Sequence, residues 1–160
     1  MLFRSPTAAS VPVTGPSSCT ETDLRASIDV NDGIGWTGAM GSRMATIRLR
    51  NAGSAACVIA DLDPLELVDG EGRLLIAGGH PGSSSLVLRP GEVVATTVRT
   101  ADLCAAPEPV APVRVRFLLG AGSGTVTVEP LSASDVGGVP PCNGDPNAPA
   151  GEIEMHAWAP

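Results

Sequence analysis

The chain has 160 residues, of which 43% are hydrophobic and 2% aromatic, and its formal net charge is −7. This length suits one domain whose core is built from aliphatic side chains. The acidic balance and the shortage of rings argue against nucleic acid and anionic membrane surfaces as partners, because binding them needs positive charge or stacking. No apolar run in the sequence approaches the roughly 18 residues of a membrane helix, so we expect no transmembrane segment.

After a Ser-, Thr- and Pro-rich leader, expected to be flexible over residues 1–18, short segments alternate apolar with polar residues. Turn signals such as Asp69-Gly70 separate them, and a Gly-rich connection is expected over 31–42. The expected strands, in chain order, are 24–30, 45–50, 57–59, 65–67, 73–77, 92–99, 113–117, 125–128 and 153–157. Such short strands, eight or nine in number, predict one all-β domain over 19–160, built as an antiparallel sandwich or barrel.

The four cysteines are the most informative residues: Cys19, Cys57, Cys104 and Cys142 follow one another at intervals of 38, 47 and 38 positions. An even number at such wide spacing indicates disulfides, because zinc ligands usually come in pairs about two to four residues apart. Four cysteines allow three pairings, and the near-equal spacing favours Cys19–Cys57 with Cys104–Cys142. Disulfides persist in oxidising compartments, so we expect an extracellular or cell-envelope protein. Residues 1–18 lack the apolar core of a signal peptide, and we expect the export signal to be missing or truncated here.

The order and spacing of several short motifs resemble a known family over most of the chain from Cys19 onward. These motifs are Cys19 with Asp23-Leu24, the glycines Gly33, Gly35 and Gly38, Leu49-Arg50-Asn51, Gly53 with Cys57, Asp69 with Gly72 and Leu74, Leu88 with Pro90-Gly91, Cys104 and Cys142. The chain is similar to domain of unknown function 4232, found in secreted proteins and lipoproteins of high-GC Gram-positive bacteria. The resemblance implies an immunoglobulin-like β-sandwich, export, and no catalytic residues. A Gly-aromatic-Pro step that the family usually has after its second cysteine is replaced by residues 60–64.

Trp36 is the best candidate for a binding anchor, because this large ring lies in the Gly-flanked segment Gly35–Gly38. The alternative is a ring folded back onto the edge of the sheet. His80, within the turn-rich segment Gly78–Gly82, is either part of a binding loop or a simple exposed histidine. The sequence has no G-x-S-x-G elbow, and His156 is its only other histidine, so no nucleophile–base pair is indicated. We therefore expect no catalytic residue, no metal and no cofactor.

Taken together, these features predict a non-enzymatic exported β-sandwich module that acts as a monomer and binds an unknown protein or cell-wall partner through its loops. One alternative is a proteinase-inhibitor-like domain that presents a rigid loop, either Ser83–Ser85 or 130–151. Another is a small metal-binding extracellular protein. Asn143, Asp145 and Glu154 echo the spacing of a calcium loop, although the Asp at the first position and the Gly at the sixth are absent.

Overall fold

Eleven β-strands form the regular structure of the computed structural model, which describes residues 10, 15–30, 35–59, 65–78, 85–104, 107–120, 123–143 and 151–160. The strands are β1 (Leu24–Ile28), β2 (Thr37–Ala39), β3 (Ser42–Asn51), β4 (Cys57–Ile59), β5 (Leu65–Val68), β6 (Leu74–Gly78), β7 (Leu86–Leu88), β8 (Val93–Ala101), β9 (Arg114–Leu118), β10 (Thr125–Glu129) and β11 (Glu152–Met155). All the expected strands are present, with ends shifted by a few residues. The short strands β2 and β7 were not expected.

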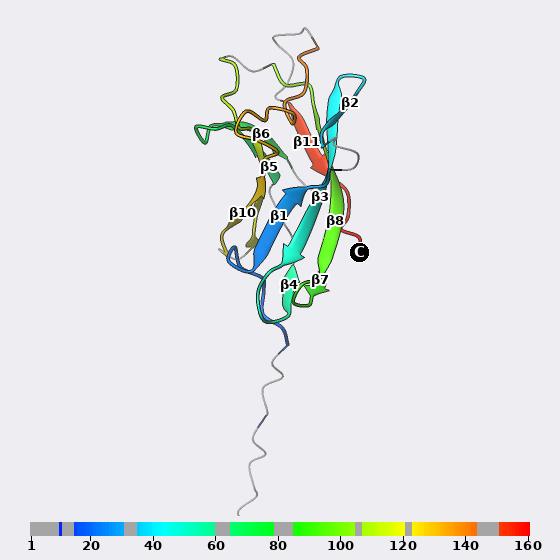
Figure 1. Cartoon of the computed structure of the whole chain (residues 1–160), viewed down its shortest axis with the longest axis vertical. Helices are drawn as coiled ribbons and strands as arrows, with labels where there is room; N and C mark the ends of the chain where they lie inside the picture. Colours follow the sequence, from blue (N-terminus) through cyan, green and yellow to red (C-terminus); the bar gives the residue numbers. More distant parts are fainter. Residues whose placement is uncertain are drawn as a thin grey trace, which may run out of the picture.

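The main sheet is mixed and nearly closes on itself. Its strands run in the order β11-β8-β3-β1-β10-β9-β5-β6, with β2 paired to β3 (Figure 1). Among the described strands of this path, only β1 and β10 pair in parallel, and this pairing joins the two halves of the sheet. The end strand β11 also contacts β6 and β5. The expected immunoglobulin-like antiparallel sandwich is thus corrected to one barrel-like sheet, because β1 uses its second edge to bond β10 instead of leaving two separate sheets.

Gly78 allows the two ends of the sheet to approach each other. It is the last residue of β6, and a Cβ atom placed on it would lie 2.1 Å from the main-chain oxygen of Ile153 in β11. Real Cβ atoms do not come so close to a neighbour, so a residue without a side chain is required at this seam.

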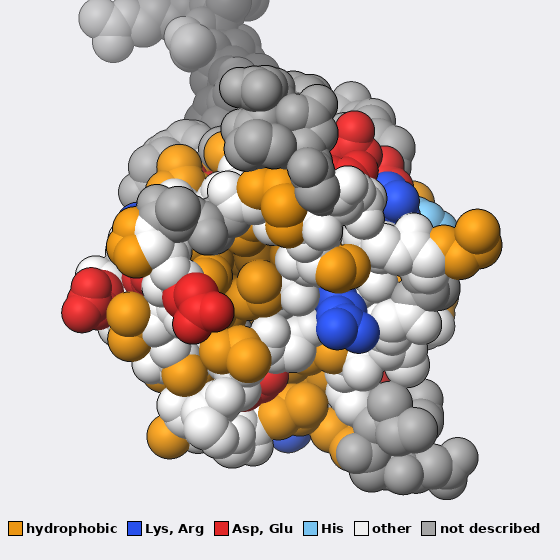
Figure 2. Space-filling view, turned by 90° about the horizontal axis from the view of Figure 1, so that it is seen from above, with side chains coloured by type: hydrophobic (Ala, Val, Ile, Leu, Met, Phe, Trp, Pro, Cys, Tyr) orange, Lys and Arg blue, Asp and Glu red, His pale blue; other side chains and the backbone are white. Residues whose placement is uncertain are grey.

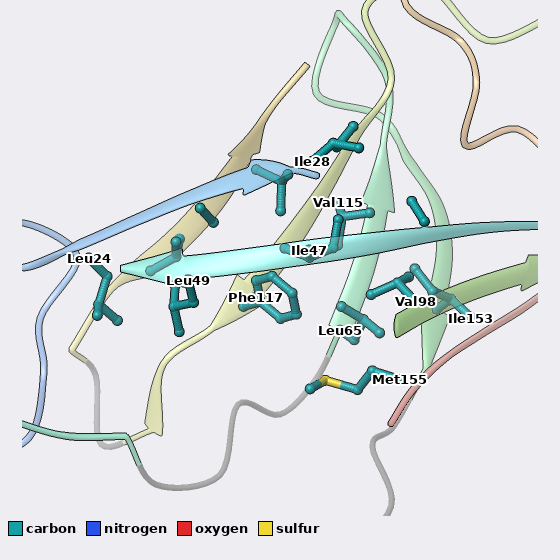
Figure 3. Packing of buried hydrophobic residues seen from close by; sticks show 14 of the residues in the cluster. Leu24, Ile28, Ile47, Leu49, Leu65, Val98, Val115, Phe117, Ile153 and Met155 are labelled. Carbon is teal, nitrogen blue, oxygen red and sulfur yellow. The ribbon is translucent and has the colours of Figure 1, made fainter. Parts of the chain in front are cut away.

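Strand alternation buries one face of the sheet around a largely aliphatic core. Figure 3 shows the ring of Phe117 among Ile47, Leu49 and Leu65, all of them fully buried. The ring of Trp158 lies 5.6 Å from that of Phe117, so the C-terminal segment also packs on the core. Burial of such side chains contributes about 1.5–3 kcal/mol each, which is how a core poor in aromatics is stabilised.

A two-stranded ribbon, β4 with β7, lies at the end of the molecule away from β2 (Figure 1). The fully buried side chain of Asn51 fastens this ribbon to β3. Its Nδ2 donates to the main-chain oxygens of Leu88 in β7 (3.0 Å) and Ala55 (2.9 Å), and its Oδ1 accepts from the N–H of Gly53 (2.8 Å). One polar side chain therefore satisfies three main-chain groups at the junction of the two sheets.

Disulfides join Cys19 to Cys57 and Cys104 to Cys142, which confirms the pairing that the spacing favours. The first bridge is buried, with both cysteines 3% exposed, and fastens the chain ahead of β1 to β4. Main-chain bonds of Val58 to Ser17 and Cys19 extend this attachment. The second bridge is exposed and fastens the segment after β8 to the end of the loop that follows β10. Two disulfides suit an extracellular or otherwise oxidising location.

Candidate functional site

Trp36 lies immediately before β2 and packs against the chain that follows β10. Cβ atoms placed on Gly137 and Gly138 would lie 2.6 and 2.9 Å from its ring, so the ring rests directly on the main chain of these two glycines. On the adjoining residue, Gly35, a Cβ would lie 2.4 Å from the side chain of Leu131. The two segments are therefore fitted together, and larger residues at any of the three glycines would separate them.

The loop of residues 131–139, here called the Asp135 loop, is held from within by a buried carboxylate. Asp135 accepts from the N–H of Leu131 (2.9 Å) and of Gly137 (2.8 Å), one bond to each oxygen. Its main-chain oxygen accepts from Val113 (2.7 Å), just ahead of β9. The hydroxyl of Thr100 in β8 donates to Gly138 (2.7 Å). Hydrogen bonds to β8 and to the residue ahead of β9, together with the two internal bonds to Asp135, fix the shape of this loop.

Apolar side chains project from the fitted segments into solvent. Leu131 is 46% exposed and Val136 45%, and the half-buried ring of Trp36 lies beside the loop. We call these three residues the Trp36 surface. The Asp135 loop and the β2–β3 hairpin both lie in the upper half of Figure 1, and Figure 2 shows hydrophobic side chains gathered across the face seen from above. Exposed apolar groups gathered on a fixed loop are typical of protein-binding surfaces.

The indole N–H of Trp36 is buried and, within the described part of the molecule, has no hydrogen-bond acceptor. An unpaired buried donor costs about 1–3 kcal/mol of stability, so the packing of this ring must outweigh that cost. The ring is thus folded back, as the alternative for Trp36 expects, but onto the Asp135 loop rather than the edge of the sheet, while Leu131 and Val136 supply the exposed apolar area.

Of the other candidate residues, only some lie within the described part of the chain. His80, Ser83, Asp145 and most of the loop 130–151 after Asn143 lie outside the described residues. His156 uses its main chain to bond Thr96 and Thr97. Across the described ranges, no group of three or more His, Cys, Asp or Glu side chains is placed to hold a metal ion. Nor does any helix there have the length and apolar character needed to cross a membrane.

Asp69 is a buried carboxylate at a position where the sequence indicated only a hairpin turn. Its side chain is 1% exposed and accepts from the main-chain N–H groups of Arg73, Glu71 and Val110, and from Nε of Arg73. Burial raises the pKa of this carboxyl, but the bonds from Arg73, Val110 and Glu71 and the charge of Arg73 together outweigh burial, so the pKa lies below its usual 3.8. Asp69 is thus a structural anion that clamps the β5–β6 turn to the segment before β9.

Comparison with known families comes to one finding. The model of a family described as a domain of unknown function, DUF4232, matches residues 19–158. The matched range contains every described strand, both disulfides and the Trp36 surface. No curated protein and no solved structure matches the chain. Because the family model covers nearly the whole sequence, this chain belongs to the DUF4232 family.

Proposed function

We propose that this domain is an extracellular module that binds a protein partner and does no catalysis, and that the Trp36 surface is its contact. The observation that carries the proposal is the exposure of Leu131 and Val136 on a loop clamped by Asp135. A fixed loop loses little conformational entropy on binding, so its apolar side chains can contribute their burial to affinity. A cell-wall partner stays the less favoured choice, because this surface offers apolar groups rather than the polar ones that glycans need.

The position of the surface supports the same proposal. Residues 15–19 join the domain at the β4–β7 end, whereas the Asp135 loop lies toward the opposite end (Figure 1). A chain attached ahead of Cys19 would therefore leave the Trp36 surface open to a partner.

The test is site-specific photo-crosslinking with a photoreactive residue in place of either of two exposed valines. Val136 (45% exposed) lies on the Trp36 surface, and Val87 (50% exposed) lies on the ribbon, so the two positions are matched in size and exposure. We expect a discrete covalent adduct with an extracellular protein from Val136 only. Equal adduct formation at both positions, or adducts from Val87 alone, would contradict the proposal.

Further variants separate the packing role of Trp36 from recognition of a partner by the exposed side chains. Trp36→Phe keeps a ring on the glycines and removes the buried N–H, so the melting temperature is expected to stay within a few degrees. Leu131→Ser and Val136→Ser are each expected to abolish the adduct formed by a photoreactive residue at the other of these two positions, while leaving the fold intact. Persistence of the adduct in both serine variants would remove the Trp36 surface as the contact.

A further inference from the structure

A cleft opens on the outer face of the sheet where β1 and β10 part. The two strands run side by side in the same direction (Figure 1), but their parallel pairing is confined to Ala26 with Val128 and Ser27 with Glu129. Ahead of this pairing lies a cleft of about 310 Å³. Its lining comes from the turn before β1 and from both strands: Glu21, Leu24, Arg25, Ala26, Thr125, Val126, Thr127 and Glu129.

Main-chain groups of both strands face this cleft. The bond from the N–H of Asp29 to Thr46 shows that odd-numbered residues of the β1 segment bond β3, so Leu24 directs its main chain toward β10. The bond from Leu119 to Gly124 shows that even-numbered residues of the β10 segment bond the β9 side. Thr125 and Thr127 therefore direct their main-chain groups toward β1.

Two side chains occupy hydrogen-bonding positions that a strand's main chain would otherwise take. Nη1 of Arg25 donates to the main-chain oxygen of Leu24 (2.8 Å) and to that of Thr22 (3.3 Å). Oε2 of Glu21 accepts from the N–H of Thr125 (3.3 Å). The cleft is thus an interrupted stretch of sheet in which polar side chains stand in for main-chain partners.

The charged groups of the lining keep hydrogen-bonding capacity. Guanidinium carries five N–H donors, and the bonds of Arg25 within the described residues use Nη1 alone, which leaves Nε and Nη2. Within the same residues the side chain of Glu129 has no hydrogen bond or ion pair, and the side chain of Glu21 uses one of its two oxygens. The lining therefore offers one cation and two anions, together with Thr125 and Thr127.

We propose that this cleft binds a short peptide with free amino and carboxyl ends, of dipeptide or tripeptide size. Arg25 would hold the carboxylate, and Glu129 the ammonium group, while the peptide's own N–H and C=O groups bond the open strand edges. The cleft's volume lies at the lower end of the range for small-ligand sites, which favours a ligand of this size. This site lies on the outer face of the sheet and does not depend on the Trp36 surface.

The test is an NMR titration of the full chain with L-alanyl-L-alanine as the probe. We expect chemical-shift changes at the amides of Thr125 and Thr127 that saturate by about 10 mM. Blocking either end of the probe, by N-acetylation or C-amidation, is expected to weaken binding about tenfold. Shifts that are absent up to that concentration, or equal for free and blocked probes, would overturn the proposal.

Matched variants locate the binding. Arg25→Gln and Glu129→Gln are each expected to weaken binding about tenfold. Arg50→Gln is the control, because Arg50 lies directly opposite Arg25 on β3 but does not line the cleft. Glu129→Gln is the decisive variant, since its side chain makes no described bond that folding would lose. Equal affinity in Glu129→Gln and Arg50→Gln, with Arg25→Gln also unaffected, would refute the assignment.

Discussion

Replacement of Asn51 by alanine is expected to destabilise the fold strongly, because this side chain joins β3 to the ribbon. The substitution removes the two bonds that Nδ2 donates to Leu88 and Ala55 and the one that Oδ1 accepts from Gly53. At about 1 kcal/mol for each bond, with buried groups left unpaired, the free energy of unfolding should fall by about 3–4 kcal/mol. For a chain of this length the melting temperature should fall by about 10 °C.

The measurement is urea unfolding followed by circular dichroism, with both disulfides kept intact. Arg50→Ala is the matched control, because it changes the neighbouring residue of the same strand, whose side chain faces solvent. Its effect should stay within about 0.5 kcal/mol. If Asn51→Ala lost no more stability than this control, the described junction between β3 and the ribbon would be wrong.

Three further outcomes follow from the seam, the buried carboxylate and the bridges. Gly78→Ala should lower the melting temperature, because the added Cβ would collide with the main-chain oxygen of Ile153; an unchanged value would argue against the closed seam. The lowered pKa of Asp69 gives stability that is full above the unfolded-state value of 3.8 and is lost as pH falls through the folded-state pKa; acid titration of the unfolding midpoint should show this loss, and Asp69→Asn should flatten it. A dithiol should reduce the exposed Cys104–Cys142 bridge before the buried Cys19–Cys57 bridge, as thiol alkylation and mass spectrometry would reveal; the reverse order would contradict the burial described.

The strands of the main sheet were predictable because one face of each is buried. Residues 24–28 alternate buried and exposed along the whole of β1, and the same period marks β9 and β10. β2 escaped prediction because Thr37–Ala39 lies in a Gly-rich segment, and β7 because Leu86–Leu88 is a short apolar run that shows no alternation.

Strand pairing was harder to predict from the sequence than strand position. Alternation says which face of β1 is buried, but it does not say which strand lies along its second edge, so the parallel partner β10 could not be foreseen. The cysteine pairing could be predicted because each disulfide joins two cysteines that follow one another in the sequence.

The candidate site was predictable only in part. The flanking glycines marked Trp36 as a candidate, but the residues on which its ring packs, Gly137 and Gly138, are about a hundred residues away in the sequence. Asp69 was expected only as part of a hairpin turn and Asp135 drew no prediction, because burial and multiple N–H donors are properties of the folded chain. Exposed Leu131 carries no signal of its own until the loop that presents it is folded.

The idea that the Trp36 surface is fixed before any partner arrives is tested most directly by amide hydrogen exchange in the free protein. The amides of Leu131 and Gly137 donate to Asp135, and we expect both to exchange at least about 100-fold more slowly than in an unstructured peptide. Exchange of both amides at the unstructured rate would contradict it, because the apolar side chains would then not be held in place for binding.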